Sequence, residues 1–357
     1  MRTMESDYMH YAKTKSRAKY NLAVSGVPGF PLTDFPIEVK DMLTPGQSDY
    51  GYAPLMAEIG KRYGVPERNI VHTFGTSMAN YLVLSALLEP GDEIITEHPV
   101  YELILRTAEH LRATVKRVYR RHEDGYRVHP EEIKKLITPK TRFILLTNLH
   151  NPSSVLIPED TLKEIGEIAA SANAYVLVDE VYLDAAFSLK PRTAFHLGDR
   201  FIVTNSLTKV YGLSILRCGW IFANEELTKR IWRMIDLLYV IAPFTIERLS
   251  VTAFQNLEAP AKRSRTLLET NRALLREFLK TRSDLEVPLP DQGTVIFPKL
   301  VDGKNEKLYT LLREKYETSI VPGSFFEMPE HFRLGYCGET EMFREGLRRL
   351  GLALDEL

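Results

Sequence analysis

The sequence predicts an α/β fold in which a mostly parallel sheet is covered by helices on both faces and joined to a smaller α+β domain. Short, continuously apolar runs alternate with helical runs through the middle of the chain, as is typical of parallel strands buried on both faces. This alternation ends near residue 259. The length of 357 residues also exceeds what one simple core normally holds, so we expect two domains.

The larger predicted domain, residues 40–258, contains the alternating segments. Seven strands are expected there, over residues 69–74, 92–97, 113–119, 141–148, 174–181, 200–205 and 219–224. Helices are expected between them, over residues 77–88 and 101–111, from about residue 130, from Pro158 and over residues 225–238. Pro158 favours a helix start because proline fits the first helical turn.

The smaller predicted domain combines residues 1–39 with residues 259–357. Its carboxyl-terminal part begins with a charged amphipathic helix over residues 259–281. Strand-like and helical segments then alternate over residues 293–300, 306–316, 319–324 and 331–336, before a final helix from residue 339. The amino-terminal residues carry proline and glycine punctuation without a strand–helix unit, so we assign them to the same domain.

Composition argues against several classes of function. The 46 basic and 47 acidic residues give a net charge of -1, so no global field favours nucleic acid or an anionic membrane. No signal peptide is evident, and the apolar stretches are well short of the ~20 residues of a membrane span. Cys218 and Cys337 match no zinc or disulfide pattern, so we expect buried free thiols. These features predict a cytoplasmic protein without a metal site.

Polar groups are predicted at the carboxyl ends of strands, where ligands bind in open parallel sheets. Gly75, Thr76 and Ser77 lie between a strand and a helix, so their N–H groups and hydroxyls suit a phosphate. A plain helix cap is the alternative. Asn151 follows another strand, in the segment LLTNLHNPSS, whose Asn-Pro and serines are also typical of a turn.

The next two strands end in an acid and in a lysine. Asp179 closes a long apolar run, where a buried carboxylate needs a partner and a surface aspartate is the alternative. Ser206, Lys209 and Arg217 follow in NSLTKVYGLSILRCGW, and a hydroxyl with a guanidinium suits a phosphate. Lysine, acid and phosphate loop together predict a site for pyridoxal phosphate, which forms a Schiff base with lysine and pairs its ring nitrogen with an acid.

These motifs resemble those of the fold type I pyridoxal-phosphate enzymes, and specifically the class I and II aminotransferases, nearly from end to end of the chain. SLTKVYGLSILRCGW is similar to the family signature S-x-x-K-x-x-G-x(4)-R-x-G. The resemblance implies an internal aldimine on Lys209 and phosphate contacts from Ser206 and Arg217. The motif TFGTS implies phosphate binding by Gly75, Thr76 and Ser77, and EHPVYE implies that Tyr101 stacks on the ring. NLHNPSS implies a contact of Asn151 with the ring's phenolic oxygen. DEVY implies a contact of Tyr182 with the same oxygen and pairing of Asp179 with the ring nitrogen.

Two further segments imply how the substrate is bound. VSGVPGFP and VPGSFFEMPEHFRLGY resemble family segments that place Gly26 against the substrate carboxylate and Arg333 on it, with Asn151 nearby. The expected reaction moves an amino group between an amino acid and a 2-oxo acid. Lys209, Asp179 and Tyr182 are the expected catalytic residues, with Lys209 transferring the α-proton.

Departures from the family pattern leave an alternative open. Ser153 and Ser154 replace a Thr-Gly pair, Leu149 replaces a proline, and Val27 and Gly29 replace acids. A pyridoxal-phosphate-dependent carbon–sulfur lyase, which eliminates a group from the β-carbon, is therefore the alternative enzyme. A ligand-sensing regulator is disfavoured, because the segment before Gly26 is too short for the DNA-binding domain that such proteins normally carry.

The resemblance also implies a homodimer with sites near the subunit interface. The tyrosine that normally reaches the neighbouring subunit's phosphate should fall at Gly46, because Gly51 and Leu55 fit the frame of its motif. Tyr50 or Tyr52 is expected to replace it.

The substrate's side chain is less strongly indicated. Aspartate-specific relatives often carry a second arginine after the helix that follows the lysine block. Residues 239–247 contain none, which favours a neutral or apolar side chain. Lys15 or Arg17, in the amino-terminal segment, is the alternative source of that positive charge.

Overall fold

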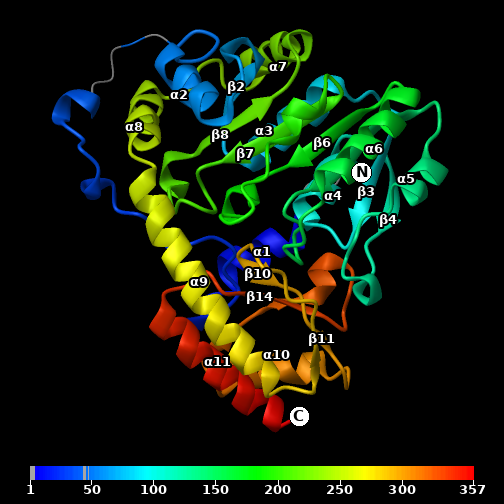
Figure 1. Cartoon of the computed structure of the whole chain (residues 1–357), viewed down its shortest axis with the longest axis vertical. Helices are drawn as coiled ribbons and strands as arrows, with labels where there is room; N and C mark the ends of the chain where they lie inside the picture. The colour runs from blue at the N-terminus through cyan, green and yellow to red at the C-terminus, as the bar shows by residue number, and fades with distance from the viewer. Residues whose placement is uncertain (1–4, 43–45, 47) are drawn as a thin grey trace.

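A seven-stranded sheet forms the larger part of the protein (Figure 1). The computed structural model describes residues 5–42, 46 and 48–357. The strands are β2 (Ile70–Phe74), β3 (Glu93–His98), β4 (Thr114–Tyr119), β5 (Thr141–Thr147), β6 (Tyr175–Asp179), β7 (Phe201–Ser206) and β8 (Cys218–Phe222). Their order is β2-β8-β7-β6-β5-β3-β4, and only β8 runs antiparallel to its neighbours. The predicted mostly parallel sheet is confirmed.

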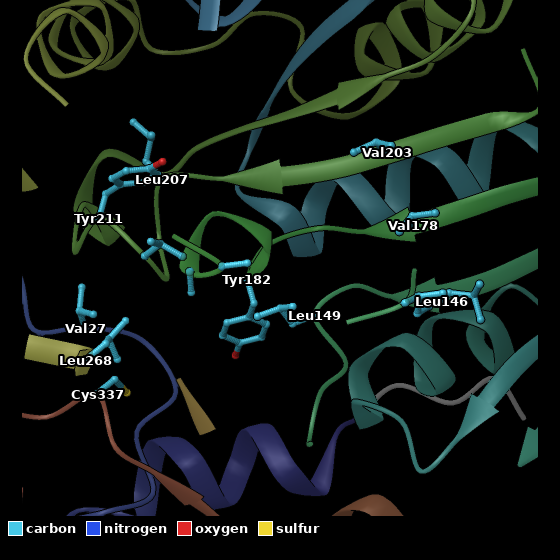
Figure 2. Packing of buried hydrophobic residues seen from close by; sticks show 14 of the residues in the cluster. Val27, Leu146, Leu149, Val178, Tyr182, Val203, Leu207, Tyr211, Leu268 and Cys337 are labelled. Carbon is cyan, nitrogen blue, oxygen red and sulfur yellow. The ribbon is translucent and has the colours of Figure 1, made fainter. Parts of the chain in front are cut away.

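Helices cover both faces of this sheet. Side chains from α3 (Thr76–Leu87), α4 (Glu102–His110) and α7 (Glu225–Leu238) join one apolar cluster, and side chains from α2 (Ala53–Tyr63), α5 (Pro130–Leu136), α6 (Glu159–Ser171) and α8 (Phe244–Gln255) join the other. Adjacent strand residues enter opposite clusters, as Leu145 and Leu146 do. Figure 2 shows Leu146, Val178 and Val203 on three neighbouring strands of one cluster. Burial on both faces explains the continuously apolar strands.

Short sheets and long helices form the smaller part of the molecule. The strand pairs are β1 (Tyr20–Asn21) with β12 (Thr318–Ser319), β9 (Leu285–Glu286) with β11 (Lys299–Leu300), and β10 (Val295–Ile296) and β13 (Val321–Pro322) on either side of β14 (Phe332–Gly335). The helices are α1 (Asp7–Thr14), α9 (Glu258–Lys280), α10 (Asn305–Glu314) and α11 (Thr340–Asp355). Figure 1 shows α9 running from α8 down to the region of α10 and α11. The division at residues 39/40 and 258/259 stays a prediction.

Three helices were not predicted from the sequence. In α2 the signals were present, since Pro54 lies in its first turn and Gly64 ends it in a left-handed conformation with φ of 67°. α8 buries Leu249 and Phe254 against the larger sheet's core. α1 depends on tertiary contacts, because a carboxylate oxygen of Glu102 on α4 accepts a 2.9 Å hydrogen bond from the Tyr8 N–H. This contact spans 94 residues and leaves no local pattern, so the local signal of α1 is confined to its cap, where the Ser6 side chain accepts from the Met9 N–H.

Two kinds of feature are absent from the described residues, 5–42, 46 and 48–357. No helix in these ranges combines the length and apolar character needed to cross a bilayer. The same ranges contain no group of three or more histidine, cysteine, aspartate or glutamate side chains arranged to hold a metal ion. Cys218 and Cys337 are buried and unpaired as disulfides.

Candidate active site

One cavity of about 470 Å³ brings the predicted site residues together, a size suited to a small-molecule ligand. It lies at the carboxyl ends of β5, β6 and β7 and is bounded by α1, by residues 21–25 and by β14. Ten of the twelve predicted residues line it: Thr76, Ser77, Tyr101, Asn151, Asp179, Tyr182, Ser206, Lys209, Arg217 and Arg333. The two glycines, Gly26 and Gly75, lie directly behind Lys209 and Arg217.

Lys209 projects into this cavity from the turn that follows β7. Its amine donates a 2.9 Å hydrogen bond to the Ser25 hydroxyl and lies 5.8 Å from the centre of the Tyr182 ring. Burial lowers the pKa of the amine below its usual value, so more of it is unprotonated and nucleophilic at neutral pH. A Cβ at Gly26 would lie 3.1 Å from the lysine side chain, so a glycine there leaves Lys209 its space.

Asp179 ends β6 as a buried carboxylate, only 5% exposed. It accepts hydrogen bonds from the Asn80 amide at 2.8 Å and the Val181 N–H at 3.1 Å. Within the described ranges it forms no ion pair, and burial raises its pKa to about 6. A protonated ring nitrogen would supply the positive charge that this acid lacks.

Replacing Asp179 by asparagine should stabilise the cofactor-free protein at high pH. Because the pKa of Asp179 is raised in the native state, the native protein still holds this proton between about pH 4 and pH 6, where the unfolded chain has released it. The free energy of unfolding therefore falls as the pH rises through that window. At pH 8 the variant should gain about 2–3 kcal/mol in free energy of unfolding. Urea titrations at pH 8 and pH 5 should show this gain shrinking with falling pH, and a gap independent of pH would contradict the assignment.

A cradle for an anion lies at the amino terminus of α3. Gly75 precedes the helix with φ of 82°, and no side chain caps the free N–H groups of the first turn. The Thr76 hydroxyl donates to Ser206 Oγ at 3.0 Å instead of capping the helix. Arg217 donates to the Phe74 carbonyl at 2.9 Å, and a Cβ at Gly75 would lie 2.6 Å from its guanidinium. Free N–H groups, hydroxyls and a guanidinium are the donors that phosphate takes.

Arg333 on β14 is a buried cation without a carboxylate partner among the described residues. It is 1% exposed, and it donates to Asn151 Oδ1 at 3.1 Å and to the Tyr8 hydroxyl at 2.7 Å. Its Nε is buried with no hydrogen-bond partner in the described structure. A buried guanidinium is costly unless an anion pairs with it, so this side chain is suited to bind a ligand carboxylate.

A buried ion pair holds Asn151 in place. Glu97 and Arg120, both fully buried, pair at 2.8 Å. Glu97 also accepts from the N–H of Thr147 at 2.9 Å and from its hydroxyl, and that hydroxyl oxygen accepts from the Asn151 N–H at 3.0 Å. The main chain of Asn151, whose side-chain amide contacts Arg333, is thus anchored to this ion pair, although Arg120 Nη2 has no hydrogen-bond partner in the described structure.

Two tyrosines complete the walls near Lys209. Tyr182 is buried, and burial raises the pKa of its phenol to about 12, so it stays a hydrogen-bond donor at neutral pH. Tyr101 begins α4 and meets the ring of Tyr8 edge to face at 5.6 Å. Figure 2 shows the Tyr182 ring extending from the sheet region toward α1, beside Leu149.

Three residues of the site were missed by the sequence reasoning: Tyr8, Ser25 and Asn80. Asn80 had a signal, as an amide within the apolar helix MANYLVLSALL that also accepts from Thr204 at 2.7 Å. Tyr8 and Ser25 had none, because their partners Arg333 and Lys209 lie 325 and 184 residues away.

The residues that depart from the family pattern mostly bond within the protein. The Ser154 hydroxyl donates to the Val295 carbonyl at 2.7 Å, and Ser153 Oγ lies 2.6 Å from His150 Nδ1. Neither serine is among the described residues that line the cavity. Leu149 is buried in the apolar core. These substitutions alter the support of the site without changing the groups that face a ligand.

The donor set fits pyridoxal phosphate. The amine of Lys209 suits the cofactor's carbonyl, the acid at Asp179 suits the ring nitrogen, and the cradle at Gly75 suits the phosphate. The cofactor carries no carboxylate, so Arg333 is left to bind the carboxylate of a substrate.

Comparisons with known proteins place this chain beside aminotransferases. The family model described as aminotransferase class I and II matches residues 47–350. An arginine–pyruvate transaminase of Pseudomonas aeruginosa is 28% identical over 98% of this chain and 94% of its own length. An aspartate aminotransferase of Streptomyces avermitilis is 24% identical over 93% of this chain and 88% of its own length. A pyridoxal-phosphate-dependent aminotransferase from Streptococcus suis superposes with a TM-score of 0.92 and 27% identity, covering 100% of this chain and 99% of that one.

Proposed function

The chain belongs to the class I and II aminotransferases, and we propose that it performs transamination with Lys209 as its catalytic amine. It is a pyridoxal-phosphate-dependent transaminase, so the cofactor and reaction expected from the sequence are confirmed. One observation carries the assignment of residues. Lys209, the unpaired acid Asp179 and the unpaired arginine Arg333 line the same cavity.

The cofactor-binding roles follow from the surroundings of each group. When bound, pyridoxal phosphate supplies a carbonyl that links to an amine and a ring that accepts the electron pair left by the α-proton. We assign its phosphate to the cradle at Gly75, Thr76, Ser77, Ser206 and Arg217. Asp179 keeps a proton on the ring nitrogen, because its buried charge is stabilised by a cation there.

The remaining cofactor contacts come from the walls beside Lys209. The phenol of Tyr182 would donate a hydrogen bond to the ring oxygen, since its raised pKa keeps it protonated. The amide of Asn151, held by Thr147, binds the same oxygen. Tyr101 packs against the ring face.

We assign substrate binding to Arg333 and proton transfer to Lys209. The Arg333 guanidinium binds the α-carboxylate and so fixes the α-carbon in front of Lys209, which replaces a diffusional encounter by a defined geometry. We assign Gly26 to a position beside that carboxylate, because it packs directly against Lys209 without a side chain. Once the substrate's amine has displaced it, the amine of Lys209 takes the α-proton and returns it as general base and acid.

The carbon–sulfur lyase alternative is not favoured. It rested on the departures at Ser153 and Ser154 and around Gly26. The two serine hydroxyls bond within the protein, and neither these serines nor Val27 and Gly29 are among the described residues that line the cavity. The two enzymes differ in products. With an amino acid that carries a leaving group on its β-carbon, we expect transfer of the amino group to an added 2-oxo acid. Release of pyruvate and ammonia without such transfer would refute transamination as the main reaction.

We further propose that the enzyme is a cytoplasmic homodimer in which Tyr50 reaches the neighbouring subunit's phosphate. Apolar side chains in the last turn of α7 and just after it are exposed, with Leu237 at 79%, Val240 at 65% and Ile241 at 58%. Tyr50, itself 49% exposed, contacts α7 through Asp236, whereas the Tyr52 ring packs against Phe244 within the chain. Sedimentation equilibrium should give twice the chain mass, and a monomer that is fully active would contradict this proposal.

The relatives leave the substrate's side chain open. One is named for arginine and another for aspartate, which carry opposite charges. The lining of this cavity therefore has to decide between them.

A further inference from the structure

The lining of the cavity contains one more cation than the reaction uses. Among the described residues, four basic side chains line it, Arg17, Lys209, Arg217 and Arg333, against a single acid, Asp179. Lys209 serves the reacting amine, Arg217 the phosphate and Arg333 the α-carboxylate, while Asp179 serves the ring nitrogen. Arg17 is left, and it has no hydrogen-bond, ion-pair or ring partner within residues 5–42, 46 and 48–357.

We propose that Arg17 binds the side-chain carboxylate of an acidic substrate, so that the enzyme prefers dicarboxylic amino acids and 2-oxo acids. This inference rests on the proposed function, because it names the substrate class of the same site. Arg17 would act as a specificity-determining residue: it touches the distal end of the substrate and takes no part in proton transfer.

The backbone around Arg17 is fixed, so the arginine is presented from a defined position. Arg313 on α10 donates a 2.6 Å hydrogen bond to the carbonyl of Lys15. Ser16 is buried, and its hydroxyl donates to the Ala12 carbonyl at 2.8 Å. Tyr20 then enters the β1–β12 pairing. Only the side chain of Arg17 is left to adjust to a ligand.

The wall between the two ends of the substrate suits a short aliphatic chain. α1 carries Tyr8, whose hydroxyl accepts from Arg333, and the wall continues through Met9, Ala12 and Ser16 to Arg17. Tyr8 and Ala12 share one face of α1, since residues four positions apart on a helix are neighbours, and Ser16 and Arg17 follow in the segment after the helix ends at Thr14. A substrate bound to Arg333 by its α-carboxylate would pass its methylene groups over this largely apolar surface and meet the guanidinium of Arg17.

The charges of the cavity argue against the other side-chain classes. A cationic side chain would meet Arg17, while Asp179, the one acid in the described lining, is committed to the ring nitrogen. A neutral side chain would leave Arg17, which is exposed, paired only with solvent. The missing arginine in residues 239–247 favoured a neutral substrate, but the amino-terminal alternative is the one that the lining supports. Of its two candidates, Lys15 is not among the described lining residues.

Isosteric substrate pairs test the proposal. The holoenzyme would be assayed with glutamate against glutamine and with aspartate against asparagine, comparing wild type, Arg17→Met and, as a matched control, Lys15→Met. Methionine keeps an unbranched apolar stem and removes the charge. In Arg17→Met, kcat/KM for the preferred acid should fall roughly 10- to 30-fold, the loss expected for one partly exposed charge-assisted hydrogen bond. The values for the amides should change less than about twofold, and Lys15→Met should match wild type for all four.

A binding measurement separates recognition from catalysis. Succinate and butyrate have four carbons each and differ by one carboxylate. Calorimetry should show that the wild-type holoenzyme binds succinate more tightly, and that Arg17→Met loses this difference.

Equal losses for acids and amides, or an unchanged preference for succinate, would overturn the assignment of Arg17. Wild-type transamination of neutral amino acids with no acid preference would do the same while leaving the proposed function intact. Failure to transaminate any substrate would instead contradict the proposed function itself.

Discussion

Replacing Lys209 by alanine should reduce transamination by a factor on the order of 10^4 or more, because one amine both holds the cofactor and moves the α-proton. Burial, which lowers the pKa of this amine, prepares it for both tasks. The variant should bind pyridoxal phosphate without the visible absorbance of a lysine-bound cofactor. Stopped-flow absorbance with added amino acid would measure the half-reaction.

An exposed lysine provides the control for this substitution. Lys229 lies on α7 and pairs with Glu225 at 2.7 Å, and it is not among the described residues that line the cavity. Lys229→Ala should keep wild-type rates and absorbance. Full transamination by Lys209→Ala would show that the reactive amine has been misassigned.

Replacing Arg333 by alanine should lower kcat/KM for every amino acid roughly 10²- to 10³-fold, since truncating one partner of a buried charge pair typically costs 2–5 kcal/mol. The substituted arginine would leave Asn151 and the Tyr8 hydroxyl without their shared donor. Steady-state kinetics with several amino acids would measure the loss. The absorbance of the bound cofactor should persist, because Arg333 contacts the substrate's carboxylate.

Arg333→Lys distinguishes charge from geometry. A lysine keeps the positive charge but lacks the planar fork that binds a carboxylate with two parallel hydrogen bonds. It should therefore recover only part of the lost kcat/KM. An alanine variant that loses cofactor but keeps its affinity for carboxylate inhibitors would contradict the assignment.

Much of the larger sheet was predictable because its signals are local. β5, β6 and β7 read as continuous apolar runs, since both faces of each strand are buried in apolar clusters. α7 was predicted with the bounds that the structure shows, residues 225–238. α1 was missed, because a helix of eight residues depends on the contact between Tyr8 and Glu102. The predicted strand over residues 293–300 is two short strands, since Phe297 and Pro298 separate β10 from β11.

The site residues also divide into those with a local sequence signal and those that depend on distant contacts. Lys209 and Asp179 follow strands of the parallel sheet, so topology alone placed them at one edge. Arg333 could be proposed only by resemblance, because β14 lies in another part of the chain. No pattern joins Tyr8 or Ser25 to the residues that they touch. The choice between Lys15 and Arg17 also needed the folded chain, since their sequence neighbourhood does not show which of the two faces the cavity.

The central claim is that Lys209 is the residue to which the cofactor is linked. Borohydride reduction of the holoenzyme, followed by proteolysis and mass spectrometry, tests it most directly, because reduction makes that link permanent. We expect a phosphopyridoxyl group on the peptide that contains Lys209, and its disappearance when substrate amino acid is added before reduction. A label on another lysine, or a label that substrate does not displace, would contradict the account.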